Sequence, residues 1–176
     1  MLTNGQPGLM PLQVSFSGKI LRRGFWLYVW EIKPPDFKSL YYVGRTGDSS
    51  SLNAQSPFNR MSQHLGSAAN SNMLRKHLAR YSIDPESCEF RLVAVGPLAD
   101  ESSQVERQEH DRRRDQVAAM EKALAGIFVD AGCEVMNTVA SRKTLDVARF
   151  AEVRAGFEQS FPSLAGRQVS RHTKGV

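Results

Sequence analysis

The pattern of apolar and polar residues along the chain predicts three β-strands. Residues 24–32, GFWLYVWEI, are aromatic and β-branched, as strands prefer. A loop with two prolines separates them from LYYVGR, residues 40–45, and so short a connection predicts an antiparallel pair. The third strand is predicted over CEFRLVAVG, residues 88–96, and should end at Gly96-Pro97.

Four helices are predicted from apolar residues at helical spacing and from the signals at helix ends. The first has Ser56 as its N-cap and Pro57 in its first turn, and Gly66 lies just past its end. The third is charged in its first half and apolar in its second, and Gly132 should end it. CEVMNT, residues 133–138, then forms a short extended segment. The predicted helices are 56–66, 71–82, 100–131 and 144–161.

This order of elements predicts one α+β domain, with a small antiparallel three-stranded sheet flanked by helices. A chain of 176 residues is long enough to bury such a core. We expect an N-terminal extension over 1–23, the core over 24–140, a C-terminal helix over 141–160 and a basic tail over 161–176.

The composition limits the class of protein. A hydrophobic fraction of 41% and a charged fraction of 23% are those of a soluble globular protein, not a disordered one. There is no apolar run long enough to span a bilayer and no signal-peptide pattern at the start. Cys88 and Cys133 have neither metal-site nor disulfide spacing. We expect a cytoplasmic protein with no membrane partner and no nucleotide cofactor.

The charge balance is basic, which favours a polyanionic partner without proving one. Lysine and arginine number 23 against 18 acidic residues, a net charge of +5. The excess is uneven, because the final segment GRQVSRHTKGV contains no acid. Such a tail is usually only solvated, and contact with nucleic acid is the less common alternative.

Two tyrosines on the predicted hairpin are the first candidates for chemistry. Side chains alternate along a strand, so Tyr28 and Tyr42 can share a face, with their hydroxyls close together. Gly44 beside them has no side chain, which leaves room for a ligand to approach the backbone. Tyrosine pairs of this kind are more often packing than catalysis.

Arg60 and His64 are four residues apart on the first helix and therefore project side by side. A guanidinium can bind two phosphate oxygens, and an imidazole can transfer a proton near neutral pH. The simpler interpretation is a polar pair that faces solvent.

Glu121 lies within the apolar stripe of the long helix, together with Val117, Leu124 and Phe128. A carboxylate that faces inward needs a partner, because an unpaired buried charge is costly. That partner is either a structural Arg or Lys, or a hard cation such as Mg²⁺. The sequence pattern does not choose between them.

These residues, in this order, resemble the GIY-YIG nucleases, a family of homing, repair and restriction endonucleases. The resemblance runs from WLY (26–28) and YVG (42–44), through Arg60 and His64, to Glu121 and MNT (136–138). It covers Gly24 to about Thr138 and agrees with the predicted sheet and helices. In the first motif Trp-Leu stands in place of Gly-Ile. The stretch from Gly44 to Arg60 is longer than usual for the family, which leaves Arg75 and Arg80 as rivals to Arg60.

The resemblance implies a role for each of these residues. Of the two tyrosines, Tyr28 is preferred as the residue that deprotonates or orients the attacking water, with help from His64. Arg60 stabilises charge on the phosphate, and Glu121 holds a single Mg²⁺ or Mn²⁺. Arg45 contacts the phosphate, and Asn137 braces the site or contacts DNA.

The resulting prediction is a metal-dependent DNA endonuclease, either a compact restriction or defence nuclease or a repair nuclease. Only a helix and the tail follow Asn137, so specificity would come from insertions in the core, from a homodimer or from a partner protein. The alternatives are a non-catalytic nucleic-acid-binding module with the same fold and a purely structural α+β domain.

Overall fold

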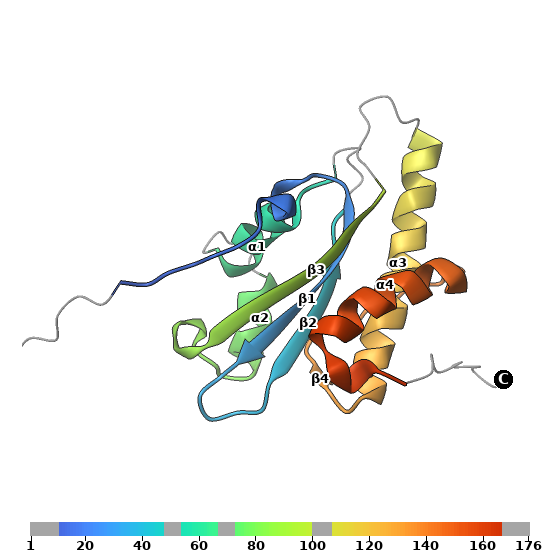
Figure 1. Cartoon of the computed structure of the whole chain (residues 1–176). Helices are drawn as coiled ribbons and strands as arrows, with labels where there is room; N and C mark the ends of the chain where they lie inside the picture. Colours follow the sequence, from blue (N-terminus) through green and yellow to red (C-terminus); the bar gives the residue numbers. More distant parts are fainter. Residues whose placement is uncertain (1–10, 48–53, 67–72, 100–106, 167–176) are drawn as a thin grey trace, which may run out of the picture.

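The protein is an α+β domain built on a mixed four-stranded sheet with helices on both faces (Figure 1). The computed structural model describes residues 11–47, 54–66, 73–99 and 107–166. The strands are β1 (Phe25–Lys33), β2 (Leu40–Arg45), β3 (Glu89–Ala99) and β4 (Glu134–Val135), and the sheet order is β3-β1-β2-β4. The helices are α1 (Pro57–Leu65), α2 (Met73–Arg80), α3 (Arg107–Asp130) and α4 (Val147–Ser160).

The sheet differs from the predicted three-stranded one in its fourth strand. β1 pairs antiparallel with β2 and with β3, as predicted, but β4 pairs parallel with β2. β4 has only two residues and lies in the segment that the sequence analysis described as extended. The prediction that β3 ends at Gly96-Pro97 is wrong, because the strand continues to Ala99 beside the start of β1. A shift in register between Phe25 and Leu27 accommodates this extension.

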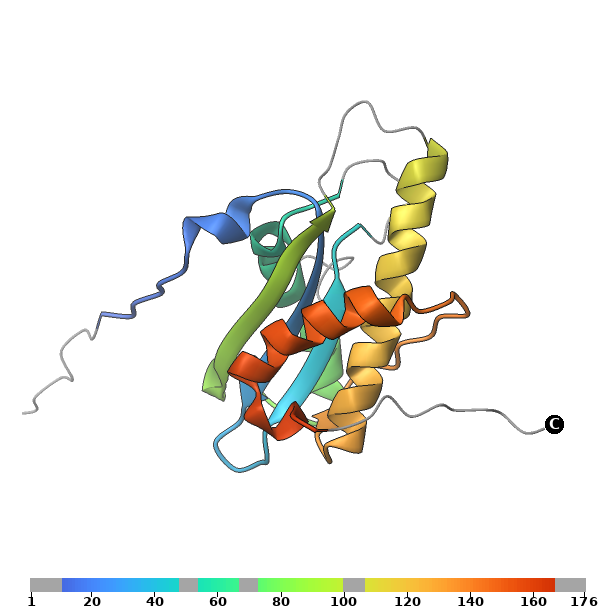
Figure 2. The ribbon, with the colours of Figure 1, turned by 45° about the vertical axis from the view of Figure 1, so that its right-hand side comes forward.

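Alternating side chains of β1 divide the interior between the two faces of the sheet. Phe25, Leu27 and Val29 face α3 and α4, which lie together on one side in both ribbon views (Figures 1 and 2). Tyr28 and Trp30 face the opposite side and pack with Leu74 and Leu78 of α2. Tyr28, the candidate residue on β1, therefore lies on the face that α1 and α2 cover.

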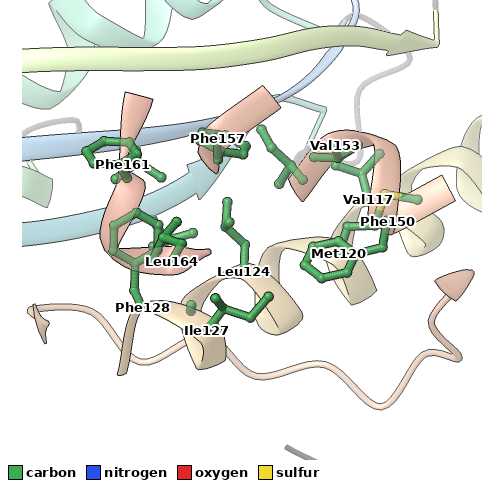
Figure 3. Packing of buried hydrophobic residues seen from close by; sticks show 14 of the residues in the cluster. Val117, Met120, Leu124, Ile127, Phe128, Phe150, Val153, Phe157, Phe161 and Leu164 are labelled. Carbon is green, nitrogen blue, oxygen red and sulfur yellow. The ribbon is translucent and has the colours of Figure 1, made fainter. Parts of the chain in front are cut away.

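The larger core forms where α3 and α4 pack on the sheet (Figure 3). Its helical members are Val117, Met120, Leu124, Ala125, Ile127 and Phe128 from α3 and Phe150, Val153 and Phe157 from α4. Phe161 and Leu164, which the sequence analysis assigned to the basic tail, are also buried here. The remainder of that tail, from 167 on, lies outside the described residues.

Predicted helix ends agree with the structure where their signals are local. The Ser56 hydroxyl accepts a hydrogen bond from the Asn59 amide, so Ser56 is the N-cap of α1 and Gly66 its C-cap. Gly132 ends α3 with a φ of +79°, a conformation that favours glycine. The predicted start of this helix, 100–106, lies outside the described residues. No helix in the described part of the chain could span a membrane.

Candidate active site

The most buried pair of candidate residues is Tyr28 and His64. The Tyr28 hydroxyl and His64 Nε2 lie 2.7 Å apart, and both side chains are almost completely buried. Tyr28 comes from the centre of β1 and His64 from the last turn of α1, so the contact joins the sheet to the helix. If Nε2 accepts, the phenol proton points at the imidazole. The geometry therefore suits proton transfer between a phenol and an imidazole.

Gly44 is required by the Tyr28 ring rather than by a ligand. Gly44 lies directly opposite Tyr28 in the β1–β2 ladder, and the tyrosine ring lies over it. A β-carbon at Gly44 would lie 2.5 Å from Tyr28 Cζ and 2.6 Å from its hydroxyl oxygen. The expectation that this glycine leaves backbone open to a ligand is thus wrong, because the space holds the tyrosine.

Gly44→Ala should displace the Tyr28 ring and break its contact with His64. The ring is 1% exposed and cannot move without repacking, so we expect a loss of about 1–3 kcal/mol in the free energy of unfolding. Urea denaturation measures this. Gly126→Ala on α3 is the matched control, because a β-carbon there has nothing within 4 Å and should be neutral or stabilising. Equal stabilities for the two variants would show that Tyr28 does not depend on Gly44.

Tyr42 lies between two histidines on the same face of the sheet. Its ring centroid is 4.9 Å from that of His64 and 5.6 Å from that of His77. His64 belongs to α1 and His77 to α2, so Tyr42 links both helices to β2. The sequence analysis predicts that Tyr28 and Tyr42 lie close together. In the structure both rings pack against His64.

Glu121 has a structural arginine as a partner. Arg45 Nε donates to Glu121 Oε2 at 2.9 Å, and the side chains are 15% and 16% exposed, respectively. Arg45 is the last residue of β2 and also donates from Nη1 to the Gly47 carbonyl at 3.3 Å. Of the two partners that the sequence left open, the structure contains the ion pair. The guanidinium predicted to contact phosphate contacts this carboxylate.

A polar pocket of about 470 Å³ brings several candidates together. Tyr42, Glu121 and Asn137 line it, from β2, α3 and the segment after β4. Met73, His77 and Arg80 line it from α2. The pocket is therefore a place where a ligand could meet a phenol, a carboxylate, an imidazole and a guanidinium at once.

Asn137 braces β2 from the wall of this pocket. Its Oδ1 accepts from the Val43 amide at 3.0 Å, and its Nδ2 donates to the Val43 carbonyl at 2.7 Å. Both bonds continue the pairing that β4 makes with β2, beyond the point where β4 ends. In this structure the side chain supports the strand that carries Tyr42 and Arg45.

Arg60 does not line the pocket that contains Glu121. It is on α1 one turn before His64, and its Nη1 donates to Gln63 Oε1 at 3.1 Å. Among the described residues the pocket lining includes Arg80 but not Arg60, Tyr28 or His64. The candidates thus form two groups, the Tyr28–His64 pair with Arg60 on α1, and Glu121 in the pocket with Arg45 as its partner. Tyr42 packs on His64 and lines the pocket together with Glu121.

His77 is the residue that the sequence analysis missed. The sequence places it among apolar residues of α2, which is typical of a packing residue. Its helical spacing from Met73 and Arg80 indicates that the three can share a face. Burial, and to a lesser extent the neighbouring Arg80 guanidinium, lower the pKa of His77 below its ordinary value. The imidazole is therefore neutral near pH 7, with one N–H donor and one acceptor nitrogen.

The pocket can accommodate a hard cation through a single carboxylate, that of Glu121. The described residues contain no group of three or more His, Cys, Asp or Glu side chains that could hold a metal. Mg²⁺ binds proteins through one or two carboxylates and keeps several waters or phosphate oxygens. Glu121 in a polar pocket fits that mode, provided that Arg45 gives up its bond to the carboxylate.

Comparisons with known protein families, with curated proteins and with solved structures find no match for this chain.

Proposed function

We propose that this protein is a metal-dependent DNA endonuclease of the GIY-YIG type. One observation carries the proposal: Tyr42 and Glu121 share a polar pocket, and Tyr42 also packs on a buried phenol–imidazole pair. A general base and a carboxylate that can hold a cation are the two groups that phosphodiester hydrolysis by water needs. The antiparallel pairing of β1 with β2 and with β3 supports the proposal, because the family resemblance implies an antiparallel sheet flanked by helices.

The tyrosines and His64 handle the water in this proposal. Tyr42 orients it from the pocket wall, and Tyr28 takes one proton from the water as the phenol passes its own proton to His64 Nε2, 2.7 Å away. The water oxygen then forms a bond to phosphorus as the bond to the leaving oxygen breaks. Arg60 stabilises the added negative charge on the phosphate, since a guanidinium binds two oxygens at once. A Mg²⁺ or Mn²⁺ ion held by Glu121 would supply Lewis-acid stabilisation of the leaving oxygen.

Arg45 has a partner in the site both without substrate and with a bound phosphate. Without substrate it neutralises Glu121, which keeps a largely buried carboxylate from being unpaired. With a phosphate present, the same guanidinium can move to the phosphate oxygens. Arg45 would thereby exchange one anionic partner for another as the carboxylate takes its cation.

The DNA partner is favoured by the net charge of +5. Neutralisation of phosphates releases counterions, so affinity should fall steeply as salt rises. The proposal also includes a homodimer and a role in restriction, defence or repair. Both follow from the family resemblance.

The second candidate function is a nucleic-acid-binding module without catalysis. The Arg45–Glu121 ion pair favours it, because that pair satisfies the carboxylate without any cation. Such a module would bind DNA and leave its phosphodiester bonds intact.

A plasmid assay separates the two functions. Supercoiled plasmid is incubated with the full chain in Mg²⁺, in Mn²⁺ and in EDTA, and the products are resolved by electrophoresis. The endonuclease converts the plasmid to open or linear forms only when the cation is present. Retardation of an uncut plasmid in all three conditions would instead support the binding module.

A further inference from the structure

The α2 side of the pocket contains two groups that the catalytic roles leave unused. His77 is 7% exposed, and its Nδ1 is buried without a hydrogen-bond partner among the described residues. Arg80, three residues later, lines the same pocket, and within the described part of the chain it makes no hydrogen bond or ion pair. Buried polar atoms are nearly always bonded, so this Nδ1, in a side chain that lines a pocket, is able to form a hydrogen bond with a ligand.

The chemistry of these two groups selects the ligand. A neutral imidazole offers one N–H, and a guanidinium offers several N–H groups and a positive charge. Together they bind an oxyanion, and a guanidinium suits the paired oxygens of a phosphate in particular. Glu121 also lines the pocket, but its charge is balanced by Arg45, so an anion bound there meets no uncompensated carboxylate.

The position of His77 is fixed by what surrounds it. Its ring packs against Tyr42 at 5.6 Å between centroids, and α2 is held to the sheet by the buried Leu74 and Leu78. The imidazole is thus held in place, and a ligand that bonds to it would be held beside Tyr42.

We propose that His77 and Arg80 form a phosphate-binding wall, which holds a phosphate group of the substrate beside Tyr42. This rests on the proposed function only in taking that phosphate to belong to DNA. His77 donates one hydrogen bond and Arg80 neutralises the charge. Both are positioning residues, distinct from the groups assigned to the attacking water and to the cation.

Imidazole ¹⁵N spectra of the full chain at neutral pH test the wall with inorganic phosphate as the probe. The His77 ring signals, identified by their loss in His77→Gln, should shift and saturate with phosphate but not with chloride at matched ionic strength. His110 is an internal control, because it is also buried but packs against Phe25 away from the pocket. Its signals should not move.

Charge-matched variants on the same helix supply the second comparison. Arg80→Gln should weaken phosphate binding about tenfold or more, the loss expected for one charged hydrogen bond. Lys76→Gln removes the same charge from an exposed position of α2 outside the pocket and should change little. Equal effects of the two variants, or a His77 shift that chloride reproduces, would overturn the wall.

A short DNA duplex in EDTA forms the third arm, in which cleavage cannot occur. The His77 signals should shift with the duplex as they do with phosphate. A response to phosphate alone would show that the wall holds a free phosphate and not DNA. The outcomes also separate this inference from the proposed function. An uncut plasmid with a phosphate-responsive His77 rejects the nuclease but keeps the wall, and a cut plasmid with an unresponsive His77 rejects the wall alone.

Discussion

Glu121→Gln should abolish Mg²⁺-dependent cleavage of DNA and leave folding and DNA binding largely intact. Glutamine has the size of glutamate and can still accept the bond from Arg45 Nε, but it has no charge with which to hold a cation. We expect a fall of about 10³-fold or more in the single-turnover rate, since metal stabilisation of the developing charge is worth several kcal/mol. Fluorescence anisotropy with a labelled duplex measures binding in parallel.

Glu152→Gln is the matched control for this prediction. Glu152 lies exposed on α4, so its substitution changes the net charge by the same amount without touching the pocket. It should cleave like the unmodified protein. Full Mg²⁺-dependent cleavage by Glu121→Gln would refute the assignment of the carboxylate, and loss of binding together with cleavage would point to a structural role for the Arg45–Glu121 pair.

Arg60→Lys should lower the cleavage rate by about 10² or more with little change in DNA binding. Lysine keeps the charge but loses the planar guanidinium that binds two phosphate oxygens, and the expected loss is that of a transition-state donor. The reference is Arg75→Lys, because Arg75 Nη1 donates to the Leu65 carbonyl and ties α2 to the end of α1. That variant should cost far less in rate.

The position of Arg80 makes a third variant informative. Arg80 lines the pocket with Glu121, whereas Arg60 bonds to Gln63 on its own helix. Arg80→Lys should weaken binding and leave the single-turnover rate of the bound complex nearly unchanged. If Arg80→Lys lost much of its cleavage rate and Arg60→Lys did not, the stabilisation of the transition state would be assigned to Arg80 on α2 instead of Arg60 on α1.

Sequence signals with local causes predicted the structure well. The caps of α1 follow from Ser56, Pro57 and Gly66, and the six residues of β2 coincide with the predicted strand. The shared face of Tyr28 and Tyr42 follows from strand alternation in an antiparallel hairpin. Each depends on residues that are close together in the chain.

Features that depend on distant residues could not be read from the sequence. The partner of Glu121 is Arg45, 76 positions away, and nothing in the helical stripe identifies it. β4 forms where two residues pair with the edge of β2. A segment of two residues is too short to show the alternation of apolar and polar residues that predicts a strand. Gly44 serves the Tyr28 ring, which only the register of the two strands places over it.

In the candidate site, too, local features could be predicted from the sequence and long-range ones could not. Tyr42, Glu121 and Asn137 are predicted site residues that line one pocket, but no pattern in the sequence separates them from Arg60. His77 was missed because its neighbours on α2 are core residues, and a buried histidine is usually part of the packing. Its Nδ1 has no hydrogen-bond partner among the residues that the structure describes, and the sequence pattern does not show this.

The rate of cleavage as a function of Mg²⁺ concentration tests the central claim most directly. A single-turnover assay on one labelled duplex, with enzyme in excess, isolates the chemical step from product release. If one cation at Glu121 supports hydrolysis, there is no cleavage in EDTA, the rate of the unmodified protein saturates along a one-site curve, and Glu121→Gln stays inactive at the same concentrations. Cleavage in EDTA as fast as in Mg²⁺, or coincident curves for the two proteins, would contradict the account.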